Sequence, residues 1–415
     1  MEKVYIIDAK RTAIGKFLGS LYEANPAEVC SKLIQKGFQL KNADEKSVLN
    51  DVESVIIGNV ISAGTGQGIA RKIALMAGVP QNVPAYSLNM VCGSSMQAIK
   101  NALVEIRCGA DLILCGGFEF MSNIPYATNS YIRLGKKFGD FKMIDLMTHD
   151  GLIDSINGIH MGITAENIAQ KYKITRKEQD EYSHLARQRA ISAIDSGKFV
   201  EEIVSIVLHD YKGREYIFDT DEFPNRESTL EKLASLKPTF LKNERGTVTA
   251  GNTSGINDGA AFLLLASEKY CKENRIIPIV EICEGIVTGC DPQMMGLGPY
   301  YAIEKLLRVT GKGIDDIDYF EINEAFAAQI LGCYKLLSKE YNCSVEEIIK
   351  RSNIYGSGIG LGHPLGATGA RIVVTLMHIL KHSKEQYGIA SLCIGGGMGA
   401  AVLLRKVDEN EFIER

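Results

Sequence analysis

One pattern occurs twice along the 415-residue chain: a glycine-flanked turn, an amphipathic helix, a buried strand and a second glycine cluster. In the first half CGSSMQAIKNALVEIRCG precedes ADLILCGGFEFMS, and in the second half GHPLGATGARIVVTLMHILKHSK precedes YGIASLCIGGGMGAAVLL. Short apolar strands that alternate with helices are typical of βαβ units with parallel strands. We therefore predict two related, layered α/β domains, with strands that include residues 55–57, 112–114, 261–265 and 400–404.

A segment of different character separates the two copies. Residues 122–246 carry more charge and less regular sequence, which predicts an insertion over a core domain. Within this segment, Thr175 and Glu178 have the spacing of a capping box, and Gly197 offers a stop for the helix that follows them. Insertions of this size often carry ligand contacts.

Composition excludes several classes of protein. The net charge is −4 and no long block of Lys or Arg is present, which argues against nucleic-acid binding. The first residues lack a signal-peptide core and no apolar run reaches ~18 residues. The ten cysteines form no CxxC pair and no tight Cys/His cluster, so we expect reduced thiols and no metal site. We expect a soluble, cytoplasmic protein that binds no membrane.

Cys92 is the first candidate reactive residue. It follows an apolar stretch and precedes a helix, and a thiol near a helix N-terminus has a lowered pKa. Its small neighbours Gly93, Ser94 and Ser95 leave room for a substrate carbonyl. A lone cysteine is more often a buried structural residue, but this setting favours a nucleophile.

His363 and Cys393 lie in two further glycine-rich segments. His363 follows a run of glycines and precedes Pro364, a frame in which an imidazole can activate a thiol or stabilise an oxyanion. Cys393 ends an apolar strand just before Gly395, and the glycines there either form an oxyanion hole or only permit close packing. The other histidines, His149, His184, His209, His378 and His382, are interpreted as surface or hydrogen-bonded residues.

Asn323 follows a short apolar strand in EINEAFAAQ, at the strand end where α/β sheets bind ligands. It is suited to hold a water or a substrate oxygen, and it is equally suited to cap a helix. A cysteine hydrolase needs one thiolate and one base, so a second thiol in its own glycine segment is unexplained unless a second proton transfer occurs. This surplus thiol favours carbon–carbon chemistry over simple hydrolysis.

These segments together resemble one family, the thiolases, and within it the acetyl-CoA acetyltransferases. NMVCGSSMQAI, NEAFA, GHPLGATGAR and CIGGGMGAA are similar to its four reactive motifs and occur in the same order. The resemblance covers nearly the whole chain and extends to HMGITAEN, VTAGNTSGINDGAA and DPQMMGLGP. RLGKKFGDFKMID is similar to the tetramerisation loop of the family.

The resemblance implies a specific architecture. We expect two duplicated βαβαβαββ domains in a layered α-β-α-β-α arrangement with an inserted loop domain. The N-terminal domain would comprise residues 1–121 plus 247–277, and the C-terminal domain residues 278–415. Residues 122–246 would form the loop domain, with CoA binding and the tetramerisation loop, and the protein would be a homotetramer built as a dimer of dimers.

The resemblance also implies a reversible ping-pong Claisen condensation of two acetyl-CoA to acetoacetyl-CoA and CoA. Cys92 would be acetylated with help from His363, and Cys393 would remove a proton from the second acetyl-CoA. One oxyanion hole would be His363 with a water held by Asn323, and the other the N–H groups of Cys92 and Gly395. Coenzyme A thioesters are substrates, so no cofactor and no metal are expected.

Substrate contacts are carried over from the same resemblance. His160, Met161 and Ser254 would meet the pantetheine arm, and Phe326 and bulky Met295 would bound a short acyl pocket. Arg226 would meet the nucleotide, although it stands one place later than the arginine usual in the bacterial pattern. Without the resemblance, Ser254 would be a turn residue and Met295 and Phe326 core residues.

Two residues depart from the family pattern. Ser95 stands where a glycine is usual, and Ser357 replaces the second glycine of a Gly-Gly pair before the histidine loop. If the backbone of Ser95 adopts a positive φ, it costs strain of ~1 kcal/mol or more, while its hydroxyl could tune the nucleophile.

Three other readings compete with the short-chain acetyltransferase. A longer-chain 3-ketoacyl-CoA thiolase shares all four motifs and differs in pocket shape. A cysteine hydrolase or thioesterase would use Cys92, His363 and Asn323 and leave Cys393 idle. A noncatalytic CoA-binding protein of the same fold would bind CoA without turnover.

Overall fold

Strands of both halves form one hydrogen-bonded path in the computed structural model, which describes residues 2–210 and 212–414. Along the path lie β12 (Tyr319–Ile322), β13 (Tyr387–Ile394), β14 (Met398–Lys406), β11 (Val280–Gly289), β1 (Val4–Arg11), β10 (Asn257–Ser267), β5 (Leu112–Phe120), β3 (Ser54–Gly58) and β4 (Ala85–Leu88), and β2 (Gly15–Lys16) pairs with β10. The four predicted strands fall within β3, β5, β10 and β14.

The two halves of the path repeat one pairing scheme. The pairs β3–β5 and β12–β13 are parallel, whereas β5–β10 and β13–β14 are antiparallel. The next pairs toward the junction of the two halves, β10–β1 and β14–β11, are again antiparallel. Between the halves, β1 and β11 pair only at Tyr5 with Glu281 and Ile6 with Val280. The repeat predicted from the glycine clusters is therefore a structural duplication.

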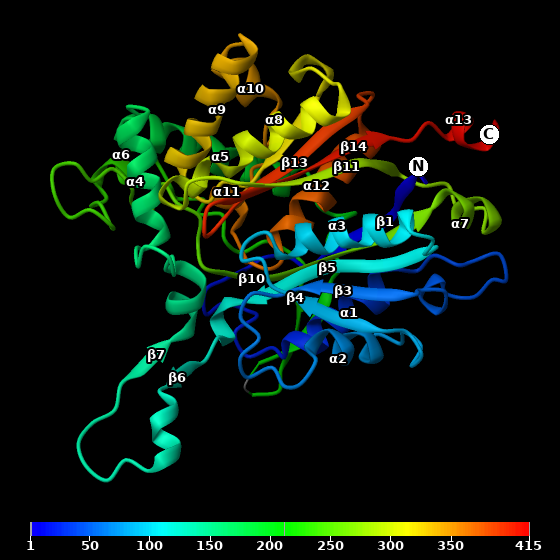
Figure 1. The fold of residues 1–415 in the computed structure, drawn as a ribbon, viewed down its shortest axis with the longest axis horizontal. Helices are drawn as coiled ribbons and strands as arrows, with labels where there is room; N and C mark the ends of the chain where they lie inside the picture. Colours follow the sequence, from blue (N-terminus) through cyan, green and yellow to red (C-terminus); the bar gives the residue numbers. More distant parts are fainter. Residues whose placement is uncertain (1, 211, 415) are drawn as a thin grey trace.

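Helices form three layers around the two halves of the sheet (Figure 1). The middle layer contains α3 (Ser94–Arg107) and α12 (Thr368–His382), the outer layer of the first half contains α1 (Pro26–Gly37) and α2 (Ile69–Met76), and the opposite outer layer contains α8 (Gly298–Thr310) and α9 (Ala327–Tyr341). Every residue of β5 and β10 is buried, as expected for strands that helices cover on both faces. This is the predicted α-β-α-β-α arrangement.

The core of the middle layer joins both halves. Ile99 of α3 and Met377 of α12 belong to one buried cluster with Leu263 of β10 and Val402 of β14. Because two helices from different halves share this core, their N-terminal ends come together at one side of the sheet.

The inserted segment contains α4 (Met161–Lys171), α5 (Arg176–Asp195), α6 (Leu230–Ser235) and two hairpins, β6 (Tyr126–Thr128) with β7 (Met143–Asp145) and β8 (Ile206–His209) with β9 (Glu215–Phe218). Thr175 and Glu178 form the predicted capping box at the start of α5, and Gly197 beyond its end has φ +68°. Both predictions for this helix are confirmed. The β6–β7 arm, residues 126–145, projects from the body of the molecule (Figure 1).

The remaining helices are α7 (Glu268–Glu273), α10 (Val345–Arg351), α11 (Gly358–Leu361) and α13 (Glu409–Glu414). No helix in the described part of the chain has both the length and the hydropathy required to cross a bilayer.

Candidate active site

A cavity of about 230 Å³ brings Cys92, His363 and Cys393 together. Its other lining residues come from both halves and from the inserted segment: Met121, Gly151, Leu152, His160, Met161, Thr239, Phe240, Ala250, Thr253, Ser254, Gly255, Ile256, Met295, Ala325, Phe326 and Leu365. The walls are largely apolar, and the titratable side chains among the lining residues are those of Cys92, Cys393, His160 and His363. A low-polarity cavity of this kind strengthens every electrostatic contact made inside it.

The turn between β4 and α3 presents Cys92 to the cavity. Val91, directly before it, has φ +48°, a left-handed conformation that is a strained outlier for a β-branched residue. The N–H of Val91 donates to Asn89 Oδ1 over 2.8 Å, and Ser94 Oγ donates to the Val91 carbonyl over 2.7 Å. These side-chain bonds hold the strained turn in place.

Gly93 allows this turn to approach the second cysteine segment. A Cβ on Gly93 would lie 2.3 Å from Ile394 Cδ1, the residue directly after Cys393. A larger residue at this position would require the Ile394 side chain to move. The sequence places a glycine where the two cysteine segments have to meet.

The thiol of Cys92 is not pre-ionised, which corrects the expectation of a lowered pKa. Burial raises the pKa of the Cys92 thiol to about 11. Hydrogen bonds from the backbone N–H groups of Gly395 and of Cys92 itself act in the opposite direction but do not offset the burial. The helix N-terminus is present as predicted, yet desolvation dominates, so a base has to remove the proton.

His363 lines the same cavity as Cys92. Its backbone N–H donates to Asn257 Oδ1 over 3.0 Å, and its side chain is 5% exposed. Burial, with a smaller effect from the charge of Arg371, lowers the pKa of His363 to about 3. The imidazole is therefore neutral near pH 7, and one of its ring nitrogens carries a lone pair.

Asn323 lies beside this histidine at the end of β12. Its Nδ2 is 3.4 Å from His363 Nδ1, and its Oδ1 is buried with no hydrogen-bond partner among the described residues. A buried oxygen of this kind is available to a water or a substrate group. Asn323 does not form the N-cap of α9, since Phe326 occupies that place. The structure thus leaves the amide free for the site.

Cys393 ends β13 and is almost completely buried. Burial raises the pKa of the Cys393 thiol, and the nearby Cys92 thiol adds to that effect. Gly396 and Gly397, which follow, have φ +82° and +85° and form the turn into β14. Gly395 differs from these two, because its N–H reaches the sulfur of Cys92.

Ser95 joins the first turns of α3 and α12. Its Oγ accepts a hydrogen bond of 2.9 Å from the N–H of Ala370. Ser95 is within α3 and is not among the non-glycine residues with positive φ, so the strain considered from the sequence is absent. Ser357, the second departure, accepts from Arg371 Nη2 over 2.7 Å and so ties the glycine run before His363 to α12.

The residues predicted to meet pantetheine and the acyl group line the same cavity. His160 caps α4 by accepting the N–H of Gly162 at Nδ1, and its ring stacks on Phe240 with centroids 4.6 Å apart. Met161, Ser254, Met295 and Phe326 also face the space. Arg226 does not: its exposed guanidinium pairs with Asp195 at 2.6 and 3.0 Å, away from the cavity lining.

Two important residues were missed by sequence reasoning. Phe240 stands in an irregular stretch with no motif, and only its stacking on His160 reveals it. Glu119 ends the buried strand β5, where its charge was the one available signal. Its Oε1 accepts from Asn59 Nδ2 and the N–H of Ile61, and its Oε2 from the N–H groups of Val60 and Gly366. It therefore anchors the histidine loop to the first half.

Comparison with known families agrees with the duplicated fold. The family described as "Thiolase, N-terminal domain" matches residues 4–269, and "Thiolase, C-terminal domain" matches residues 276–406. The chain belongs to the thiolase family. This thiolase is 42% identical over 405 residues to an acetyl-CoA acetyltransferase of Chromobacterium violaceum, covering 97% of this chain and 100% of that protein.

Solved thiolase structures have the same fold. The crystal structure of the Bacillus anthracis acetyl-CoA acetyltransferase is 41% identical, covers 98% of this chain and 99% of its own, and superposes with a TM-score of 0.89. That of human mitochondrial 3-ketoacyl-CoA thiolase is 37% identical with the same coverage and TM-score. The similarity thus extends over the whole length of the thiolase fold.

Proposed function

We propose that this thiolase is an acetyl-CoA C-acetyltransferase, which condenses two acetyl-CoA to acetoacetyl-CoA and CoA and catalyses the reverse thiolysis. The observation that carries this proposal is the meeting of two thiols, Cys92 and Cys393, with the neutral base His363 in one apolar cavity. A hydrolase has no use for the second thiol, whereas a Claisen condensation needs a second proton transfer.

In the first half-reaction His363 takes the proton of Cys92, and the sulfur attacks the carbonyl carbon of acetyl-CoA. The carbon–sulfur bond to CoA breaks, and the CoA thiolate takes the proton of Cys393 and leaves as free CoA. Cys393 is then a thiolate, and His363 keeps the proton of Cys92 at Nε2. The N–H groups of Cys92 and Gly395 both reach the Cys92 sulfur region, so they are suited to stabilise the developing oxyanion.

In the second half-reaction Cys393 removes a proton from the methyl carbon of another acetyl-CoA. The electron pair left on that carbon attacks the acetyl carbonyl on Cys92. The bond to sulfur breaks to release acetoacetyl-CoA, and the Cys92 thiolate recovers its proton from His363. The enolate oxygen would be stabilised by His363 and by a water on Asn323, whose buried Oδ1 has no partner within the described chain.

A three-variant assay tests the proposal. Wild-type protein should cleave acetoacetyl-CoA with CoA, and both Cys92→Ser and Cys393→Ala should abolish turnover. Mass spectrometry after acetyl-CoA alone should find acetylated Cys92 in Cys393→Ala but not in Cys92→Ser. Full turnover by Cys393→Ala would instead support a hydrolase or thioesterase, and CoA binding without any turnover a noncatalytic role.

A longer-chain 3-ketoacyl-CoA thiolase is the second candidate, favoured by the 37% identity to the human enzyme of that name. Met295, buried at the cavity wall, favours the shorter substrate. Cleavage of 3-ketooctanoyl-CoA at a higher kcat/KM than acetoacetyl-CoA would decide for the longer-chain activity.

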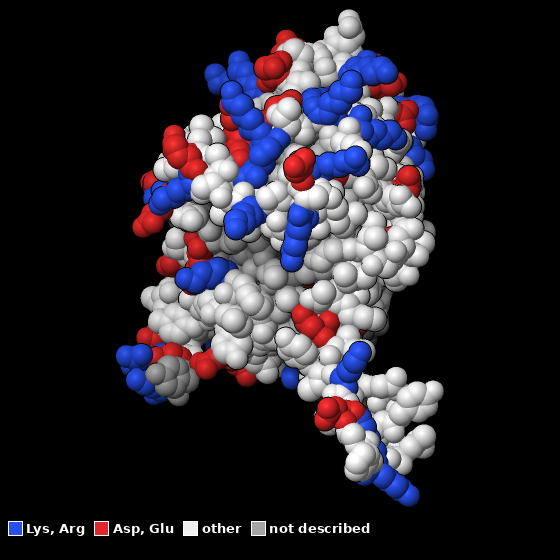
Figure 2. Space-filling view, turned by 90° about the vertical axis from the view of Figure 1, so that its left-hand side faces the viewer, with Lys and Arg blue, Asp and Glu red and all other residues white. Residues whose placement is uncertain are grey.

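CoA would enter from the face that carries α4 and α6. Figure 2 shows Lys and Arg side chains gathered above a hollow on this face, which suits the phosphates of CoA. His160, Met161 and Ser254 would contact pantetheine, and Phe326 and Met295 the acyl end. Arg226 remains a proposed contact of the nucleotide. Residues 1–121 plus 247–277, 122–246 and 278–415 are the proposed N-terminal, loop and C-terminal domains.

The proposed assembly is a homotetramer. β4 is the terminal strand of the sheet, and its exposed edge is suited to pair with a second copy into a dimer. The β6–β7 arm exposes several large apolar side chains, among them Leu134 at 82% and Phe138 at 95%, and two dimers would bury them. A cytoplasmic location fits this chemistry, because both reactive cysteines have to be reduced.

A further inference from the structure

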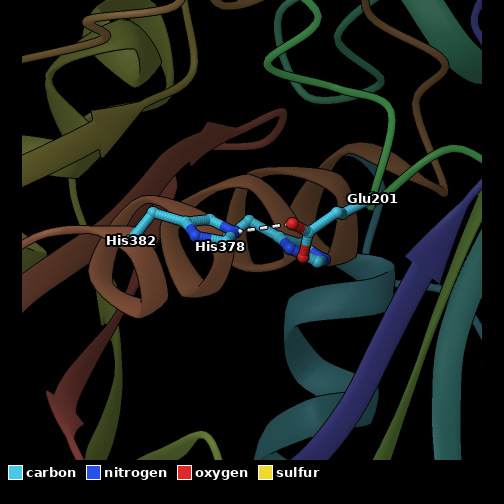
Figure 3. Close-up of side chains that lie close together, drawn as sticks. All are labelled: Glu201, His378 and His382. Atoms are coloured by element: carbon cyan, nitrogen blue, oxygen red, sulfur yellow. Dashed lines mark ion pairs between the residues drawn. The ribbon is translucent and has the colours of Figure 1, made fainter.

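Glu201, His378 and His382 converge at the end of α12 opposite to the active site (Figure 3). Each residue offers one ligand atom, and these atoms lie within 4.8 Å of one another. His378 and His382 stand four residues apart on one helix face, whereas Glu201 comes from the inserted segment after α5. Sequence reasoning treated these histidines as ordinary and assigned no metal, because the third residue is distant in the chain.

His378 has a nitrogen without a partner. Its side chain is 5% exposed, and its Nε2 lies 3.2 Å from the carbonyl oxygen of Ala9. The Nε2–H donates to that carbonyl, so the lone pair is on Nδ1, which is buried and has no hydrogen-bond partner among the described residues. Metal-bound histidines commonly donate their other N–H to a backbone carbonyl in this way.

Glu201 and His382 complete the cluster from the surface. His382 Nε2 lies 3.1 Å from Glu201 Oε1, and the two side chains are 54% and 51% exposed. Because both side chains are exposed, they can move the short distance that coordination requires.

Neighbouring charges are mixed. Lys381 Nζ is 2.7 Å from Glu201 Oε2, and Lys10 Nζ is 2.9 Å from the Glu201 carbonyl oxygen. Asp8, 3.6 Å from Lys10 Nζ, offsets part of this positive charge. Lys381 contacts Oε2, whereas His382 lies beside Oε1, so the positive charge of Lys381 opposes a cation bound at the same carboxylate. A substitution can remove this opposing charge.

We propose that Glu201, His378 and His382 bind a divalent transition-metal ion of the zinc class. Two nitrogens and one carboxylate oxygen match the ligand preference of Zn²⁺, with a fourth position open to water. Tetrahedral bonds of about 2.0–2.1 Å put ligand atoms roughly 3.3 Å apart, so the cluster has to contract from its present spread.

Binding there would stabilise the protein without entering the reaction. The ion would connect the inserted segment to α12, whose far end begins at Thr368 beside the histidine loop. At 1.5 Å per residue, the metal ligands lie about 15–21 Å along the helix from that end. The site is thus independent of the proposed acyl transfer.

The test is a Zn²⁺ titration of chelator-treated, full-length protein in the Cys92→Ser background, by calorimetry and by melting temperature. Added substitutions are His382→Ala, Glu201→Gln, Lys381→Met and the control His149→Ala. His149 is an exposed histidine 2.6 Å from Asp150, a similar pair without a third ligand. Co²⁺ replaces Zn²⁺ in a parallel titration, because a thiolate charge-transfer band would reveal cysteine ligands.

We expect one ion per chain at micromolar affinity, a raised melting temperature and no thiolate band. His382→Ala and Glu201→Gln should weaken binding by more than about tenfold, since even outer partners of metal ligands contribute about 10–100-fold. Lys381→Met should tighten it, and His149→Ala should leave it unchanged. The proposal would be overturned by equal Zn²⁺ affinity of the protein with and without His382→Ala. It would also be overturned by a thiolate band that accounts for the bound ion, or by the absence of saturable binding at micromolar concentrations.

Discussion

Thr368 Oγ1 lies 2.6 Å from His363 Nδ1, and the same hydroxyl donates to the carbonyl oxygen of Pro364 over 2.8 Å. A hydroxyl has a single proton, so Thr368 has to accept a hydrogen bond from the Nδ1–H of His363. This contact holds the imidazole in the tautomer whose Nε2 carries the lone pair. Thr368 is therefore a positioning residue for the proposed general base.

The first prediction replaces this hydroxyl. Thr368→Val should lower kcat for acetoacetyl-CoA thiolysis by about 10–100-fold, part of the roughly 10²–10⁴-fold that a positioned base contributes. Thr368→Ser keeps the acceptor and should retain most of the activity. Steady-state kinetics on both variants, with melting temperatures as a check of folding, measure the effect. Equal kcat values for the Val and Ser variants would contradict the assigned tautomer.

The second prediction concerns the ionisation of Cys92 in the free enzyme. Burial raises the pKa of this thiol to about 11, so the thiolate fraction should increase about tenfold per pH unit through neutral and mildly alkaline pH. Iodoacetamide alkylation, mapped to Cys92 by mass spectrometry, should rise accordingly between about pH 7 and pH 9. The exposed Cys108 provides an internal reference for reagent behaviour. A plateau already at neutral pH would show a pre-formed thiolate.

A feature of this molecule could be predicted from the sequence when the residues that cause it are close together in the chain. The strands within β3, β5, β10 and β14 were predictable because buried apolar runs and flanking glycines are local signals. Cys92, His363 and Cys393 were singled out by the same local glycine settings. The raised pKa of Cys92 could not be predicted from the sequence, because the residues that bury its thiol are distant in the chain.

Residues that connect the halves were beyond sequence reasoning for the same reason. Ser95 was noted only as a departure, and its role became clear when its hydroxyl was found at the N–H of Ala370. Glu201 has no local relation to His378, since the fold alone brings α12 to the inserted segment. Phe240 carries no pattern at all, and its place against His160 follows from tertiary packing.

The third prediction tests the buried anchor of the histidine loop. In Glu119→Gln one carboxylate oxygen becomes an amide NH₂ group, and each oxygen of Glu119 accepts two hydrogen bonds. In either orientation, the amide NH₂ group faces two buried N–H donors, and these two donors lose their acceptor. Each unsatisfied group costs about 1–3 kcal/mol, so two of them should lower the free energy of unfolding by about 2–6 kcal/mol.

Denaturant unfolding measures this loss, and the thiolysis assay should show reduced kcat because Gly366 is part of the loop of His363. Glu105→Gln is the matched control, since that carboxylate lies in an exposed contact with Tyr86. Equal stability of Glu119→Gln and Glu105→Gln would contradict the anchoring role.

The fourth prediction concerns chain length. Met295 is 4% exposed at the cavity wall, and its neighbour Gly296 is confined, because a Cβ there would lie 2.6 Å from Gln329 Cγ. The space beside this segment is thus filled, and Met295→Ala should enlarge the acyl pocket. The ratio of kcat/KM for 3-ketohexanoyl-CoA to that for acetoacetyl-CoA should rise by about 10-fold or more. The buried Met294, which does not line the cavity, gives the control Met294→Leu. An unchanged ratio in Met295→Ala would remove this residue from the acyl site.

The fifth prediction tests the assembly through the β6–β7 arm. The side chains of Leu134 and Phe138 are 82% and 95% exposed. Large apolar side chains exposed together commonly mark a contact with another protein surface. Leu134→Asp with Phe138→Asp places two charges in the proposed contact between dimers, where desolvating them is unfavourable. Light scattering after size-exclusion chromatography should then give about half the mass of the wild-type assembly, as expected when a dimer of dimers separates. Ile217→Asp, at a side chain 64% exposed on β9, should leave the mass unchanged. If the arm variant keeps the wild-type mass, the arm does not hold the dimers together, and its apolar side chains need another partner.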